Sequence, residues 1–136
     1  MTPSYKEGEY YLTNKITYKF SIPQRNSVIV FISPADEQLY IKRIIAVPGD
    51  VLKISNGEVY INNMKLNERY LSGDGMTKNG SYLDSDESVT IPENKYFVMG
   101  DMRDISSDSR HWGLVPKENI VGKVQFCYWN CGDWYI

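Results

Sequence analysis

Short runs of alternating apolar and polar residues extend over most of this 136-residue chain. The runs are rich in Val, Ile and Tyr and are separated by Gly, Pro, Asn or Asp, which is typical of β-strands. No long amphipathic helix pattern interrupts them, so the predicted fold class is all-β, with a mostly antiparallel sheet. The predicted strands lie within residues 9–16, 26–33, 38–47, 51–55, 58–62, 95–99 and 121–129.

The clearest local signal is the segment VLKISNGEVYIN, residues 51–62, where two alternating runs flank Asn56-Gly57. Asn-Gly is favoured in two-residue type I′ turns, so this segment predicts a β-hairpin. Residues 68–94 are polar and loop-like, with at most one strand near 88–91, and PKENI at 116–120 predicts one helical turn. We therefore expect a β core formed by 1–50 and 94–136, with 51–93 as an inserted hairpin and loop region.

Length and charge restrict the class of protein. A chain of 136 residues fits one domain, and its net charge of -2 comes from 17 acids and 15 bases without a long run of either sign. Such a surface offers no electrostatic footprint for nucleic acid. No stretch approaches the roughly 18 apolar residues of a membrane span, and the first residues lack a signal-peptide pattern.

The two cysteines, Cys127 and Cys131, do not fit a common zinc site, because the chain has one such pair and a single histidine, His111. In an extended strand the two thiols would lie about 13 Å apart at about 3.3 Å per residue. A disulfide therefore requires residues 128–130 to form a tight turn, and the unbridged state is favoured.

A dense group of charges, GDMRDISSDSRHWG at 100–113, follows the predicted strand 95–99 directly. Its acids are not spaced as in a calcium loop, which needs ligands at alternate positions, a central glycine and a closing glutamate. It also lacks the Gly-Lys-Ser/Thr ending of a phosphate loop. We interpret it as a polar cluster in which two arginines pair with aspartates, namely Arg103 and Arg110 with Asp101, Asp104 and Asp108.

Lys42 lies inside the strand QLYIKRIIAV among apolar neighbours. A strand lysine most commonly occupies an edge or a solvent-facing position. Alternatively, burial keeps the amine neutral, so that it can take a proton from a serine hydroxyl. Lowering the lysine pKa by about two would cost about 2.7 kcal/mol, which apolar surroundings can impose. The strand pattern alone leaves both readings open.

The segment YIKRIIAVPGD at 40–50, followed about fifty residues later by the charged stretch and then by IVGKV at 120–124, closely resembles the bacterial type I signal peptidases. These are membrane-bound Ser-Lys endopeptidases that release leader peptides from exported preproteins. The resemblance covers nearly the whole chain and is poorest from Leu52 to Glu93. It implies peptide-bond hydrolysis without a metal or organic cofactor. The eukaryotic-type enzymes have histidine at the base position, so Lys42 indicates the bacterial type.

The resemblance implies that Lys42 is the general base and that the Ser106 hydroxyl orients it. Asp108 and Arg110 match the ion pair that supports the site from behind, with Ser109 between them. The expected substrate is a signal peptide with an Ala-x-Ala-like cleavage site. The implied location is the extracytoplasmic face of the bacterial cell membrane for the full-length protein, with no anchor in this chain. The positions matched to substrate binding, including the subsites for small P1 and P3 side chains, are Val30, Tyr40, Ile41 and Tyr5.

The chain departs from the family pattern within two motifs and at its first residue. Met102 and Ile105 replace asparagines of the charged motif, and residues 25–27, Arg-Asn-Ser, replace Arg-Gly-Asp. The family's nucleophilic serine precedes a methionine in the pattern Ser-Met-x-Pro-Thr, and that methionine is Met1 here. The nucleophile is thus expected immediately before Met1, and Ser4 falls at the threonine position. We expect the chain as given to be inactive, whether as a fragment, a misassigned start or a pseudoenzyme.

Two other classes remain open beside the peptidase. A non-catalytic β module could keep the peptide groove and bind extended chains by strand addition. Self-cleaving repressors also use a Ser-Lys dyad, but they need an upstream DNA-binding domain and a cleavage segment, and neither is present here.

Overall fold

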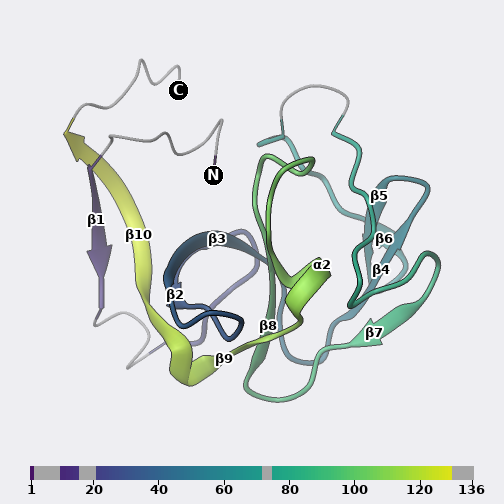
Figure 1. The fold of residues 1–136 in the computed structure, drawn as a ribbon, viewed down its shortest axis with the longest axis horizontal. Coiled ribbons are helices and arrows are strands. Elements are labelled where there is room, and N and C mark those ends of the chain that lie inside the picture. The colour runs from purple at the N-terminus through teal and green to yellow at the C-terminus, as the bar shows by residue number, and fades with distance from the viewer. Residues whose placement is uncertain (2–9, 16–20, 72–74, 130–136) are drawn as a thin grey trace.

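The computed structural model describes residues 1, 10–15, 21–71 and 75–129 (Figure 1). A six-stranded sheet runs in the order β1-β10-β2-β3-β8-β9, and each neighbouring pair is antiparallel. Its strands in chain order are β1 Tyr10–Asn14, β2 Val28–Ile32, β3 Leu39–Ala46, β8 Lys95–Met99, β9 Val115–Pro116 and β10 Ile120–Trp129. The predicted fold class is therefore confirmed.

A second, four-stranded sheet has the order β6-β5-β4-β7 and lies to the right in Figure 1. Its strands are β4 Val51–Ser55, β5 Glu58–Ile61, β6 Met64–Lys65 and β7 Ser88–Thr90. All four come from the region that the sequence analysis set apart as an insertion. Among the described residues the helical segments are short, namely α2 Ser109–Trp112 and the 3-10 turn Lys117–Asn119, which lies where PKENI predicted one turn.

The hairpin predicted at Asn56-Gly57 is confirmed. Ser55 faces Glu58 across the turn, and the two turn residues have φ of 50° and 78°. These positive values are the reason that Asn and Gly are favoured there. A second tight turn at Asn62-Asn63, with φ of 53° and 65°, joins β5 to β6. This hairpin was not predicted from the sequence, although asparagine tolerates the left-handed region better than most residues.

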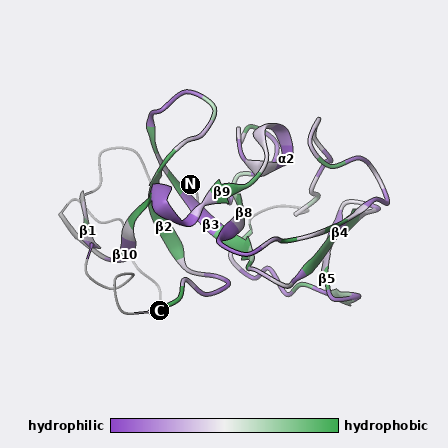
Figure 2. Ribbon diagram, turned by 90° about the horizontal axis from the view of Figure 1, so that it is seen from below, coloured by the Kyte–Doolittle hydropathy of each residue, from purple (hydrophilic) through white to green (hydrophobic). Residues whose placement is uncertain are grey.

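Two apolar clusters hold the strands together. One joins both sheets, because Ile45, Phe97 and Met99 of the larger sheet pack with Leu52 and Ile54 of the smaller. The other is formed by residues of the larger sheet, among them Ile29, Phe31, Ile44 and Val98, and Trp112 of α2 packs against it. Figure 2 shows hydrophobic stretches in strands of both sheets, clearly in β4 of the smaller one. The inserted region thus shares its core with the larger sheet and is anchored to it.

The end of the chain bears on the cysteine prediction. Strand β10 continues through Cys127 to Trp129, while Cys131 lies outside the described residues. The disulfide question therefore also lies outside the part of the chain that the structure describes.

Candidate active site

Lys42 lies on β3, the strand between β2 and β8 in the larger sheet. It faces Ile29 of β2 in the register, and the pairing of β3 with β8 begins at the next residue, Arg43. The residue is only 8% exposed. Of the two readings that the strand pattern left open, the structure therefore supports a buried lysine rather than a solvent-facing one.

Burial is the largest influence on the Lys42 amine, and it lowers the pKa below that of an ordinary lysine. The carboxylates of Asp108 and Asp101 act in the opposite direction, because they stabilise the ammonium form, whereas Arg110 lowers the pKa further. The net lowering makes the neutral amine, which is a proton acceptor, more accessible near physiological pH.

The Lys42 amine donates a hydrogen bond to Ser106 Oγ, at 2.9 Å, across a sequence separation of 64 residues. Ser106 belongs to the loop that leaves β8, the strand beside β3, so the sheet topology brings the two together. The close contact between Ser106 and Lys42 depends on Gly100. A Cβ atom at that position would lie 2.2 Å from Ser106 Oγ and 3.4 Å from Lys42 Nζ, so no larger residue fits without displacing the serine.

Asp108 and Arg110 form an ion pair behind this contact. Two guanidinium nitrogens of Arg110 donate to the two carboxylate oxygens at 2.8 and 2.9 Å, and both residues are almost fully buried. Burial by itself raises the pKa of Asp108, but hydrogen bonds from Arg110 and Ser106 outweigh it and hold the pKa below its ordinary value. Ser106 is therefore held between Lys42 and a carboxylate that stays ionised.

Local sequence explains why these residues stand where they do. Asp108 caps α2, where its side chain accepts from the backbone N–H of Arg110. Ser109 is fully buried, and its hydroxyl accepts from the backbone N–H of Val98 in β8 at 3.0 Å. The cap and this bond join α2 to the sheet and fix the direction of the charged loop.

The predicted pairing of charges within 100–113 is partly wrong. Arg110 pairs with Asp108 as expected, but Asp101 pairs with Arg43 of β3. Arg103 pairs with Glu68 in the connection between β6 and β7. These two partners are distant in sequence, and the sequence pattern predicted neither.

The predicted substrate-binding positions among the described residues lie on β2 and β3 and fall on both faces of the sheet. Val30 and Ile41 are directly opposite each other in the β2–β3 register, and both are half-buried. Tyr40 alternates with Ile41 and lies on the same face as Lys42, whose amine is 5.7 Å from the tyrosine ring centre. Tyr5 lies outside the described residues.

The two departures from the family motif have clear places in the structure. Met102 and Ile105 are exposed and line a cavity of about 160 Å³ together with Met1, Lys42, Gly100 and Ser106. Asn26 has φ of 66°, so it occupies the left-handed region that glycine or asparagine tolerates. Neither departure removes a contact between Lys42, Ser106, Asp108 and Arg110.

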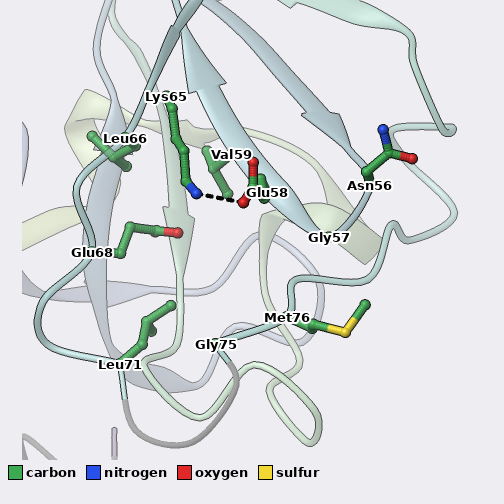
Figure 3. A pocket seen from close by; sticks show the side chains of 10 residues that line it. All are labelled: Asn56, Gly57, Glu58, Val59, Lys65, Leu66, Glu68, Leu71, Gly75 and Met76. Atoms are coloured by element: carbon green, nitrogen blue, oxygen red, sulfur yellow. Dashed lines mark hydrogen bonds and ion pairs between the residues drawn. The ribbon is translucent and has the colours of Figure 1, made fainter.

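A larger cavity, of about 370 Å³, lies on the smaller sheet (Figure 3). Its wall includes Glu58, which pairs with Lys65, and also Glu68.

Among the described residues, no helix is long and apolar enough to cross a membrane.

Comparisons with known proteins agree with this geometry. The family described as "Signal peptidase, peptidase S26" matches residues 1–129. Signal peptidase IB of Staphylococcus aureus strain Mu50 is 37% identical over 140 residues, covering 95% of this chain and 73% of the relative. Probable signal peptidase I-2 of Synechocystis sp. is 33% identical over 136 residues, covering 95% and 59%.

Among solved structures, a signal peptidase I from Enterococcus faecalis matches with a TM-score of 0.65 and 34% identity, covering 77% of this chain and 98% of that one. The match in sequence spans the β3 strand with Lys42 and the charged loop with Ser106. The match in structure reproduces the antiparallel sheets that bring them together. On both grounds the chain belongs to the signal peptidase family, peptidase S26.

Proposed function

We propose that this chain carries the general base and its supporting side chains for removing signal peptides from exported preproteins, at an Ala-x-Ala-like site. The observation that carries this proposal is the buried Lys42 amine bonded to Ser106, with the Asp108–Arg110 pair behind it. The expected place of action is the extracytoplasmic face of the bacterial cell membrane, close to its surface.

In the proposed reaction, neutral Lys42 takes the proton of a serine hydroxyl while the serine oxygen bonds to the scissile carbonyl carbon. The Lys42 ammonium then gives that proton to the leaving amine as the C–N bond breaks. Water, deprotonated by the same amine, hydrolyses the ester and frees the serine. Ser106 and Asp108 hold the lysine amine in place throughout.

The position of Met1 supports placing that serine immediately before it. Met1 lines the same cavity as Lys42 and Ser106. Burial and the neighbouring Lys42 both lower the pKa of the Met1 amino group, which reflects the closeness of the two nitrogens. A residue joined to the Met1 nitrogen would therefore enter the region of the Lys42 amine.

The sheet also offers a place for an extended substrate. Residues Leu39–Lys42 of β3 pair with β2, whereas β8 pairs with β3 only from Arg43 onward among the described residues. The other edge of this part of β3 can accept a peptide strand that ends beside Lys42. Tyr40, Ile41 and Val30 would then contact the small side chains of the substrate, and Tyr5 is assigned to the same surface by the family resemblance.

The nucleophile assignment is tested by extending the chain before Met1. A chain preceded by serine, with its upstream segment, should cleave a signal-peptide substrate in detergent, whereas the same chain with alanine at that position should show only background hydrolysis. The 136-residue chain is the third arm and should be no faster than the alanine form. Equal cleavage by the 136-residue chain would make Ser4 the leading nucleophile. Peptide binding without cleavage in the serine form would favour the non-catalytic module.

The pH dependence of the serine-preceded chain provides a second prediction. Only neutral Lys42 can act as base, so kcat/KM should rise with pH as the amine loses its proton. Because burial lowers the Lys42 pKa, this rise should level off below pH 10.5, the ordinary value for lysine. A rate that still increases at pH 10.5 would mean that a group of ordinary lysine pKa controls the reaction.

A further inference from the structure

Glu68, in the connection between β6 and β7, reaches the charged loop from the smaller sheet. Figure 3 shows it in the wall of the larger cavity. Both of its carboxylate oxygens accept from the guanidinium of Arg103, which also donates to the hydroxyl of Thr77. The side chains of Arg103 and Glu68 are 3% and 10% exposed, so this is a largely desolvated, two-pronged ion pair.

Arg103 in turn holds the backbone of the proposed active site. Its Nε donates to the carbonyl oxygen of Gly100 at 3.1 Å, and its own carbonyl accepts from Arg110 at 2.8 Å. The N–H of Gly100 donates to Asp108 at 3.0 Å. Gly100 is therefore held at both of its polar backbone atoms, by Asp108 on one side and by Arg103 on the other.

The position of Gly100 decides whether Lys42 and Ser106 can meet. A Cβ atom there would lie 2.2 Å from Ser106 Oγ, so the glycine backbone packs directly against the serine side chain. A small displacement of this backbone changes the space available to Ser106 and the access of water to the Lys42 amine. Displacements of about 1 Å in such arrangements lower the rate of an enzyme on the order of 100-fold.

Loss of Glu68 would leave the Arg103 charge without the carboxylate that pairs with it in the described part of the chain. A buried guanidinium that loses its partner is strongly unfavourable, so Arg103 would turn toward water and release the Gly100 carbonyl. Two aspartates of the same loop already have partners, because Asp101 pairs with Arg43 and Asp108 with Arg110, and the third, Asp104, is exposed, so a pairing with it would also draw Arg103 toward the surface.

We propose that Glu68 is a positioning residue for the reaction at Lys42, which it controls by holding Arg103 and, through Arg103, the backbone of Gly100. The proposal rests on the proposed function for its kinetic consequence, but the geometry that it describes exists without catalysis. It gives the inserted region a role in the site, since Glu68 and Thr77 both lie within 51–93.

The first measurement is the Lys42 pKa, followed by NMR in the 136-residue chain with isotope-labelled lysine. The groups that face Lys42 are the Met1 amino group, Tyr40, Asp101, Asp108 and Arg110, and none of them is changed. Glu68→Gln should raise the Lys42 pKa, because water reaches a loosened site. Loss of the Glu68 charge alone would lower it, so a rise distinguishes repositioning from simple electrostatics.

Glu58→Gln is the matched control. Glu58 lies in the same cavity wall, but its carboxylate pairs with the exposed Lys65. This variant should leave the Lys42 pKa unchanged. If folded Glu68→Gln shows an unchanged or lowered Lys42 pKa, the proposal is overturned. Should Glu68→Gln fail to fold, Thr77→Val, which removes another acceptor of Arg103, takes its place under the same criterion.

The second measurement is kinetic, in the serine-preceded chain. Glu68→Gln should lower kcat by about tenfold or more with little change in KM, and Glu58→Gln should change neither. An unchanged kcat in folded Glu68→Gln overturns the proposal. If the serine-preceded parent does not cleave at all, the proposed function fails, while the pKa comparison still decides the positioning role of Glu68.

Discussion

Replacing Lys42 with alanine is expected to abolish cleavage of a signal-peptide substrate by the serine-preceded chain. The amine is buried in a central strand, bonded to Ser106, and is the group proposed to take the nucleophile's proton. Without it the serine hydroxyl stays protonated and is a weak nucleophile. The expected measurement is a fall of kcat/KM to background, with circular dichroism and thermal unfolding showing a folded protein.

Two further variants separate chemistry from packing. Lys42→Met keeps the length and apolar stem of the side chain and should fold well but remain inactive. Ser106→Ala keeps the lysine but removes its hydrogen-bond partner, and should slow cleavage by roughly 100-fold, the lower end of the range for acid-base groups. Near-parental turnover by Lys42→Ala or Lys42→Met would remove the lysine from the reaction.

Single substitutions in the Asp108–Arg110 pair should produce the largest losses of stability. Asp108→Asn strands the buried Arg110 guanidinium, and Arg110→Gln strands the Asp108 carboxylate. Breaking a buried pair in this way costs about 3 kcal/mol or more. The pair also holds the Gly100 N–H and the Arg103 carbonyl, so each change disturbs the loop as well. Urea unfolding of the 136-residue chain measures the free energy directly.

The Glu58–Lys65 pair provides the comparison for stability. Both side chains are largely exposed, at 40% and 61%, so Glu58→Gln should change the free energy of unfolding much less than either substitution in the buried pair. If Asp108→Asn and Arg110→Gln lower the free energy of unfolding no more than Glu58→Gln does, the buried pair does not support the site as proposed.

Much of the fold follows from local sequence. Alternation in residues 38–47 and 95–99 predicted strands that the structure contains as β3 and β8. Asn56-Gly57 predicted its hairpin because the turn requires positive φ at adjacent residues. The short strands β6 and β9 were missed, since two residues give no periodicity, and α2 was missed because four residues do not make a helical pattern.

The active-site residues likewise divide into those that the local sequence predicted and those that only the tertiary structure placed. The motifs around Lys42 and in residues 100–113 identified the family and the pairing of Asp108 with Arg110, which are two residues apart. Only the tertiary structure decided that Lys42 is buried, since a strand's pattern does not say whether it lies at an edge or in the centre of a sheet. It also decided that Arg103 pairs with Glu68, 35 residues away, because ion pairs between distant segments depend on which strands become neighbours.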